Sequence, residues 1–171
     1  MKTVKLNVGC GGTYLPGYIN IDRGATKHDL TLDLNQVRWD LPDNYADEIV
    51  INNTLEHLAE PDQKMSELHR ILKPGGTLIG EVPYAKSDGA FQCMEHKWFF
   101  TEKSFDSFCD GAGFYTPYQK PLFKMVYVRL GEVRNTQKTK LRNLIPRPLR
   151  MLLRHFIWNM FDGVEFKLIK I

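Results

Sequence analysis

Cysteine is scarce in this chain, and the features it lacks narrow its class before any motif is considered. Cys10, Cys93 and Cys109 are its only cysteines, an odd number at wide spacings, which fits a reducing compartment better than a disulfide framework. No apolar stretch is long enough to span a bilayer, and Met1–Lys5 runs directly into an expected strand. We therefore expect no signal peptide and predict a cytoplasmic protein. Internal repeats and low-complexity tracts are also absent.

The charge of the chain is unevenly divided along its length. Residues 1–121 carry 12 basic and 17 acidic side chains, net −5, whereas residues 122–171 carry 11 basic and 3 acidic ones, net +8, which together give the overall +3. With 171 residues, 43% hydrophobic and 25% charged, the composition is that of one ordinary globular domain. We predict a single domain over residues 1–171, with a basic helical insertion at about residues 135–162.

A glycine cluster between two apolar runs is the most informative motif. Residues 6–13 read LNVGCGGT and residues 17–22 read GYINID, a pattern that predicts a strand, a tight loop and a second strand ending on a carboxylate. Glycines let a ligand lie directly on the backbone, and a carboxylate at this place can accept hydrogen bonds from both ribose hydroxyls. The pattern indicates a nucleoside site.

Two classes of nucleoside ligand compete for this site. The dinucleotide fingerprint needs a third glycine that opens a helix, with its acid about 20 residues further on. Here Tyr14 stands where the third glycine belongs, and Asp22 follows Gly9 after only 22 − 9 = 13 residues, so NAD fits poorly. The order of Gly9, Gly11 and Asp22 instead resembles motif I of class I S-adenosylmethionine (SAM) methyltransferases, whose ligand has no pyrophosphate.

Later segments strengthen this resemblance. Residues 39–58, from the turn-rich WDLPDNYADE to TLEHL, are similar to the LP…FD…LEH region of the type-11 methyltransferases. A helix opened by Pro61, with Met65, Leu68 and Leu72 on one face, leads into the string LHRILKPGG and a strand over residues 77–84. Residues 5–114, about two thirds of the chain, together resemble a small class I SAM-dependent methyltransferase of the type-11 kind.

The resemblance implies an α/β fold, a doubly wound, mostly parallel Rossmann-like sheet whose antiparallel last strand is inserted near one edge. One departure concerns the connection over residues 9–17, which is shorter than the dozen or more residues that a crossover helix normally needs. Helices after the first two strands should therefore be reduced or absent. One face of the sheet would then lack cover, and a bare apolar face is not expected on a monomer.

The basic C-terminal segment offers a way to cover that face. Residues 147–161 form a predicted amphipathic helix with Leu152, Leu153 and Phe156 on one side. We predict that this side packs on protein, either in the same chain or across a homodimer. The other side carries Arg147, Arg150 and Arg154, which we expect to face solvent or an anionic surface.

The resemblance also implies the site residues. Cofactor contacts are expected from the glycine loop and the strand ends, at Asn7, Gly9, Cys10, Gly11, Asp22, Asp33, Asn52 and Asn53. Asp33 would contact the adenine, although its spacing fits a solvated loop acid equally well. A base is needed only for a hydroxyl or amine acceptor, with His96 as first candidate and His57 as second. Cys93 and His96 have a CxxH spacing, but without a second ligand pair we predict no metal.

We therefore predict a SAM-dependent methyltransferase that acts on a small-molecule or glycan-type acceptor. Two alternatives stay open at this stage. The chain could be a non-catalytic SAM-binding or partner-binding module, which its small size and missing helices suit. It could also be an RNA methyltransferase that uses the basic C-terminal segment, but that segment lacks the interleaved aromatics expected for single strands, so a nucleic-acid partner is disfavoured.

Overall fold

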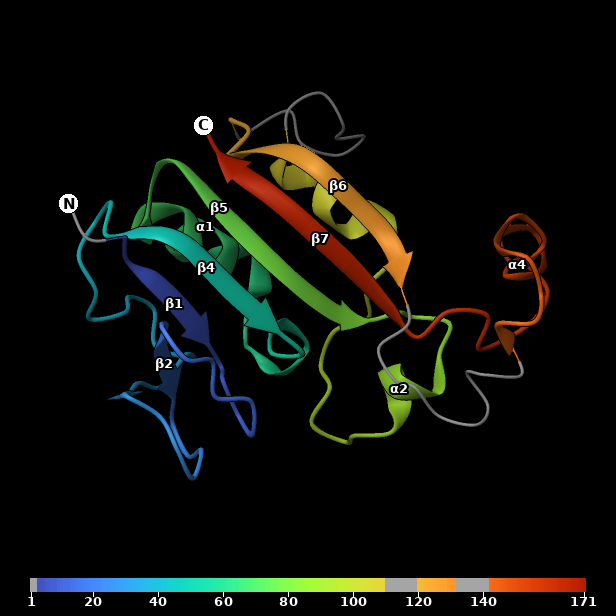
Figure 1. The fold of residues 1–171 in the computed structure, drawn as a ribbon, viewed down its shortest axis with the longest axis horizontal. Helices are drawn as coiled ribbons and strands as arrows, with labels where there is room; N and C mark the ends of the chain where they lie inside the picture. The colour runs from blue at the N-terminus through green and yellow to red at the C-terminus, as the bar shows by residue number, and fades with distance from the viewer. Residues whose placement is uncertain (1–2, 110–119, 132–141) are drawn as a thin grey trace.

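A seven-stranded sheet organises the structure, a computed structural model that describes residues 3–109, 120–131 and 142–171 (Figure 1). The strands are β1 (Lys5–Val8), β2 (Ile19–Asp22), β3 (Leu30–Thr31), β4 (Ala46–Asn52), β5 (Leu72–Pro83), β6 (Phe123–Gly131) and β7 (Gly163–Lys170). They lie in the order β3-β2-β1-β4-β5-β7-β6, and β7 runs in the direction opposite to the other six described strands. The predicted Rossmann-like sheet is confirmed, with its antiparallel last strand inserted beside the edge strand β6.

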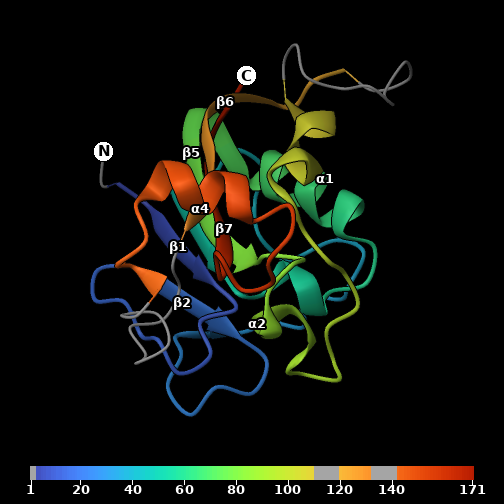
Figure 2. The same cartoon turned by 90° about the vertical axis from the view of Figure 1, so that its right-hand side faces the viewer.

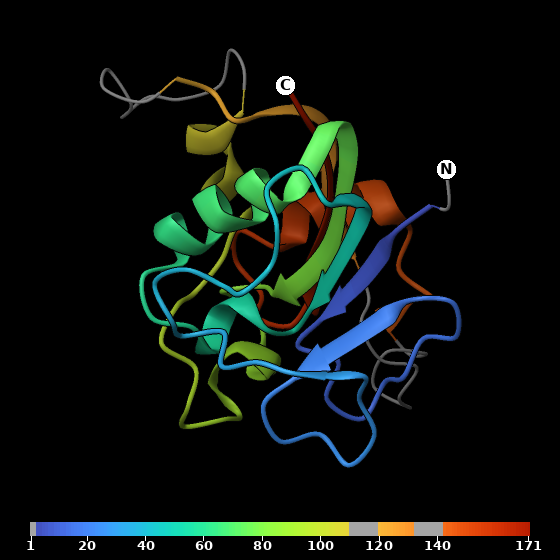
Figure 3. The same ribbon diagram turned by 90° about the vertical axis from the view of Figure 1, so that its left-hand side faces the viewer.

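Few helices accompany this sheet. The described ones are η1 (Leu55–His57), α1 (Pro61–Ile71), α2 (Asp88–Phe91), η2 (Glu102–Phe108) and α4 (Arg147–Leu153). Residues 9–18 and 23–29, which connect the first three strands, contain no helix, as the short connections predict. Both α1 and η2 lie on the same face of the sheet, seen edge-on in Figures 2 and 3.

The core lies between that face and the two helices. On β5, Leu78, Gly80 and Val82 point into it, opposite Leu168, Phe166 and Val164 of β7, and all of these except the glycine have fully buried side chains. Gly80 leaves the space that the Phe166 ring fills, since a Cβ there would lie 2.5 Å from the ring's Cζ. From the helical side, Phe105 of η2 packs on Phe166 at 4.3 Å between ring centroids. The covered face is thus closed by aromatic packing.

The opposite face of the sheet is largely polar, although Val50 and Ile79 lie side by side on it, and this corrects the expectation that it needs a cover. On this face, charged residues of neighbouring strands lie opposite each other. Lys5 opposes Glu48, with Nζ and Oε1 3.2 Å apart, and Arg129 opposes Glu165, with Nη2 and Oε2 2.8 Å apart. Thr77 of β5 lies next to Glu48 on the same face. Strands that alternate apolar and polar side chains can leave one face in water, although this is commoner in antiparallel sheets. The open face in Figure 1 therefore requires neither a helix nor a second chain.

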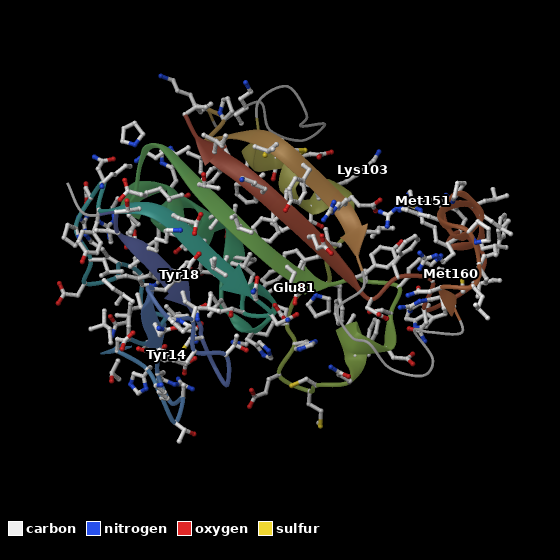
Figure 4. The ribbon with its side chains drawn as sticks, viewed as in Figure 1. Tyr14, Tyr18, Glu81, Lys103, Met151 and Met160 are labelled. Atoms are coloured by element: carbon white, nitrogen blue, oxygen red, sulfur yellow. The ribbon has the colours of Figure 1, made fainter. Side chains whose placement is uncertain are left out.

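The C-terminal excursion departs from the prediction in length and in orientation. Its helix α4 ends at Leu153 instead of residue 161, and the part of the predicted insertion over residues 135–141 lies outside the described residues. Figure 1 places α4 past the end of the sheet at which β5 and β6 finish, so it covers neither face. On its sheet side lie Met151 and, after the helix, Met160, both packed against the core (Figure 4).

The prediction that the arginines of this helix face solvent is confirmed for Arg147, which is exposed, but is wrong for Arg150 and Arg154. Arg150 is only 7% exposed, and its guanidinium and that of Arg147 lie 5.2 and 5.5 Å from the centroid of the Phe161 ring. Arg147 also donates to the carbonyl of Leu130, and Arg154 pairs with Glu102 of η2. A ring partner makes the burial of Arg150 tolerable, and a carboxylate partner does so for the partly buried Arg154.

The apolar side of the segment is turned outward as a consequence. Leu152 is 60% exposed and Phe156 83%, and Leu149, Ile157 and Trp158 are each close to half exposed. We call these five residues the apolar row. The predicted homodimer would use this row, whereas the predicted contact with an anionic surface would use the arginines, of which Arg147 is exposed. Both stay predictions.

Candidate functional site

The candidate cofactor residues gather where the parallel strands end. Gly9 follows β1 directly, Asp22 is the last residue of β2, and Asn53 and Thr54 follow β4. Because β1, β2 and β4 are neighbours and parallel, their carboxyl ends meet at one edge of the sheet. Doubly wound folds bind their ligands at this edge.

The glycine loop, residues 9–13, is packed against the end of β2 and against Thr54. The backbone N–H groups of Gly9 and Cys10 both donate to the carbonyl of Ile21, at 2.8 and 3.0 Å. Gly9 has a φ of +68°, and a Cβ there would lie 2.3 Å from Oγ1 of Thr54. Glycine is thus required at position 9 by both backbone conformation and space. Gly11 has a φ of +48° and no atom near its missing Cβ, so that part of the loop is accessible.

Asp22 fastens the loop to the second strand. Its Oδ2 accepts a hydrogen bond from the N–H of Gly11 at 2.9 Å, and its Oδ1 accepts from Gly24 and Ala25 at 2.8 and 3.0 Å. Burial alone would raise the pKa of Asp22, but these backbone hydrogen bonds outweigh it and hold the pKa below the ordinary value. The group is therefore ionised at neutral pH, with lone pairs for a further donor.

The buried side chains of Asn7 and Cys10 hold the glycine loop in place. Asn7 is 4% exposed, and its Nδ2 donates to the carbonyl of Thr13 and to Oδ1 of Asn20, both at 2.8 Å. Cys10 is likewise buried, and burial raises the pKa of its thiol. In this structure the two side chains point into the protein, so their part in a ligand site would be to position the loop.

The other candidate contacts stand at the rim of the same edge. The side chain of Asp33 is 39% exposed, and its Oδ2 lies 3.7 Å from Nη1 of Arg23. The side chain of Asn52 is exposed, whereas Asn53 adopts a left-handed φ of 46° and donates to Oε1 of Glu81 at 3.0 Å. Thus Gly11, Asp22 and Asn52 offer accessible groups, and Asn53 is tied to a neighbouring strand.

His57 and His96 are brought together, although 39 residues separate them. His57 ends η1, and His96 belongs to the irregular loop over residues 92–100; their ring centroids are 4.6 Å apart. Burial, and secondarily the charge of His96, lowers the pKa of His57. Cys93 joins the pair, so one further candidate ligand, His57, accompanies the CxxH spacing, although a second ligand pair does not within the described residues.

Two carboxyl groups near this site, one of them buried and the other half-buried, were not proposed from the sequence. Glu56 is 1% exposed, and within the described residues neither carboxyl oxygen has a hydrogen-bond partner. Burial raises its pKa to about 7. Glu81 of β5, labelled in Figure 4, is half-buried and accepts the hydrogen bond from Asn53, and burial also raises its pKa. The outward position of Glu81 in the alternating TLIGEVPY, directly before the strand ends, was a usable signal for it.

Comparison with known proteins bears on the fold, and its family match begins just after Asp22. A family model described as a methyltransferase domain matches residues 23–80. No curated protein sequence matches the chain. Among the described residues, no helix has the length and apolar character to cross a membrane.

Solved structures of similar fold cover almost the whole chain. A SAM-dependent methyltransferase from Archaeoglobus fulgidus aligns with a TM-score of 0.67 at 16% identity, over 98% of this chain and 86% of that one. A chain from the complex of the Haloferax volcanii Trm112 methyltransferase activator with a methyltransferase gives 0.64 at 13%, over 98% and 82%. The [4+2]-cyclase SpnF gives 0.59 at 16%, over 98% and 74%. At these identities the likeness concerns the fold.

Proposed function

We propose that this chain binds SAM and transfers its methyl group to a small-molecule or glycan-type acceptor. The methyltransferase-domain match and the sheet confirm its type-11 class I resemblance. One observation carries the proposal: an ionised Asp22 ends β2 and is hydrogen-bonded to the backbone of the glycine loop. A carboxylate in this place accepts hydrogen bonds from a ribose, and the open backbone around Gly11 leaves room for the ligand.

Each cofactor candidate has a distinct part in this proposal. Asp22 would accept from the ribose hydroxyls, while the backbone of Gly9, Cys10 and Gly11 would lie along the ligand, with Asn7 holding that loop in place. By resemblance to the family, Asp33 would contact the adenine, and Asn52 and Asn53 would face the methionine part. The sulfonium supplies an activated methyl group, so the protein has chiefly to position the acceptor, and proximity can contribute about 7 to 11 kcal/mol.

The acceptor would bind beside η1 and the loop over residues 92–100. If it is a hydroxyl or an amine, a base must take its proton, and the paired His96 and His57 are the candidates. Exposed aromatic side chains of the same region, Phe91, Trp98 and Phe99, suit the apolar faces of a sugar or a small metabolite. An RNA acceptor is less well supported, because four arginines of the basic segment already contact carboxylates, carbonyls or a ring.

A second candidate function is a non-catalytic partner-binding module. The apolar row, turned outward at the end of the sheet, favours it. Among proteins of this fold, one was solved with a methyltransferase activator and another is a cyclase, so methyl transfer must be measured directly.

Calorimetric titration tests the cofactor. We expect SAM and its demethylated product to bind more tightly than NAD, and Asp22→Ala to weaken SAM binding by about 1.5 to 3 kcal/mol, because hydrogen bonds to a charged acceptor are lost. Asp62→Ala, an exposed acid of α1, is the matched control and should bind as the parent does. A preference for NAD, or parental affinity in Asp22→Ala, would contradict the assignment.

Transfer of a labelled methyl group from SAM to fractionated cell extract tests catalysis. With a hydroxyl acceptor, His96→Ala should lower turnover by about a hundredfold or more and leave SAM affinity nearly unchanged, because proton removal and not cofactor binding is lost. Binding of SAM without transfer to any fraction would favour the non-catalytic module instead.

A further inference from the structure

We propose that His57, Cys93 and His96 form a binding site for a transition-metal ion, with zinc as the best-matched ion. Each residue offers one ligand atom, and these atoms all lie within 4.8 Å of one another. A zinc ion bonded at about 2.0 to 2.3 Å in tetrahedral geometry sets its ligand atoms about 3.3 to 3.8 Å apart. To enclose the ion, the ligand atoms would have to approach one another by at most about 1 to 1.5 Å.

Backbone hydrogen bonds build this cluster. The N–H of His96 donates to the carbonyl of Cys93 at 3.2 Å, a turn that brings the two side chains of the CxxH spacing together. The loop is then held on both sides of His57: Lys97 N donates to the carbonyl of Glu56 at 2.8 Å, and Trp98 Nε1 to that of Leu58 at 2.9 Å. The third ligand, His57, is thus positioned by one main-chain and one side-chain hydrogen bond, neither of which depends on the imidazoles.

The donor atoms suit zinc. Nδ1 of His96 lies 2.9 Å from the carbonyl of Ala90, to which it can only donate, so the neutral ring keeps the lone pair of Nε2 for a metal. Histidine ligands of metals commonly make this second hydrogen bond, which fixes the ring and its tautomer. Two imidazole nitrogens and one thiolate match the borderline-soft character of zinc, whereas magnesium and calcium prefer oxygen.

Three protein ligands leave one coordination position open. Structural zinc sites are normally closed by four protein ligands, while sites with three keep the last position for water or a substrate atom. Here that position would belong to the region in which we place the acceptor, so an ion there would hold an acceptor oxygen. A bound ion also occupies the imidazole nitrogens, which would exclude His96 as the base in the metal-loaded protein.

Metal analysis and cobalt spectroscopy of the full chain test this site. Protein purified without chelators, or stripped and dialysed against Zn²⁺, should carry one equivalent of zinc. Co²⁺ should give the thiolate-to-cobalt charge-transfer absorption in the parent, and this band should disappear in Cys93→Ser. His57→Ala and His96→Ala should each weaken Zn²⁺ affinity at least tenfold, while His155→Ala, at an exposed histidine, should leave it unchanged.

Several outcomes would overturn the inference. They are zinc far below one equivalent in the parent, a cobalt spectrum without the thiolate band, or an equal loss of affinity in His155→Ala. The parent measurements need no variant, so they stay decisive even if a substitution impairs folding. SAM titration of the metal-free parent separates this inference from the proposed function: zinc binding without SAM binding defeats only the function, and SAM binding without zinc defeats only the metal site.

Discussion

The helices α1 and α4 are both amphipathic in sequence, yet they pack in opposite ways. α1 buries its apolar positions Met65, Leu68 and Ile71, and the charged residues buried with them have partners. α4 buries Arg150 and exposes Leu152. Periodicity defines the two sides of a helix, but it does not decide which side faces protein when the polar side is made of arginine.

The partners that each helix meets explain the difference. Glu67 of α1 accepts from the N–H of Trp39 at 2.7 Å and from Arg70, so its charge is satisfied inside the helix's own contact surface. Around α4, Asp162, Glu102 and the Phe161 ring supply partners for arginines instead. No apolar surface of comparable extent is described opposite Leu152 and Phe156, since the covered face of the sheet is already closed by α1 and η2.

The largest expected effect lies in α1. Replacing Glu67 with Gln should reduce the free energy of unfolding by about 2 to 4 kcal/mol, because a buried carboxylate that binds Arg70 and the Trp39 amide is lost. Urea unfolding at pH 7 measures the change. Asp62→Asn, in the exposed first turn of the same helix, is the control and should change it by less than about 0.5 kcal/mol.

The same variant gives a pH dependence. Burial acts to raise the pKa of Glu67, but the Arg70 and Trp39 hydrogen bonds prevail and lower it. The stabilisation is therefore present above the unfolded-state pKa of about 4.3 and is lost as the pH falls through the folded-state value. The difference between parent and Glu67→Gln should shrink below about pH 4. A difference that grows in acid would mean that Glu67 is protonated in the folded protein.

An intermediate effect is expected where α4 meets η2. Arg154→Ala should cost about 1 to 2 kcal/mol, because the pair with Glu102 is only partly exposed and α4 is held by few contacts. The neighbouring Lys103→Ala, at an exposed side chain (Figure 4), should be neutral. A double-mutant cycle with Glu102→Ala isolates the pair, and a coupling near zero would show that Arg154 does not fasten the helix.

The smallest effect is expected on the apolar row. Leu152→Ser and Phe156→Ser should each change the free energy of unfolding by less than about 0.5 kcal/mol, because these side chains are 60% and 83% exposed. The comparison with α1 predicts that the matched Leu68→Ser, at a fully buried position, costs several times more. A loss above about 2 kcal/mol in Phe156→Ser would show that the row is covered in solution, as the predicted homodimer requires.

Local sequence patterns predicted the parts of the fold that depend on neighbouring residues. The glycine loop, the carboxylate of Asp22 and the start of α1 at Pro61 follow from backbone conformation and hydrogen bonding within a few residues. The CxxH spacing indicated that Cys93 and His96 lie near each other, but the approach of His57 depends on how their loop docks against η1, for which the sequence gives no signal. The polar open face was visible in the alternation of residues 77–81 and 165–167, but the strand register that makes it continuous was not.

The insertion of β7 between β5 and β6 has a consequence for biosynthesis. β6 ends at Gly131 and β7 begins at Gly163, and in the final sheet β6 pairs with no strand other than β7. A ribosome that adds about 5 to 20 residues per second needs about 2 to 6 s to make the intervening chain. During that time β5 and β6 both present unpaired edges, which are sites of aggregation. The nascent chain would therefore depend on protection by chaperones in this interval more than during synthesis of its first five strands.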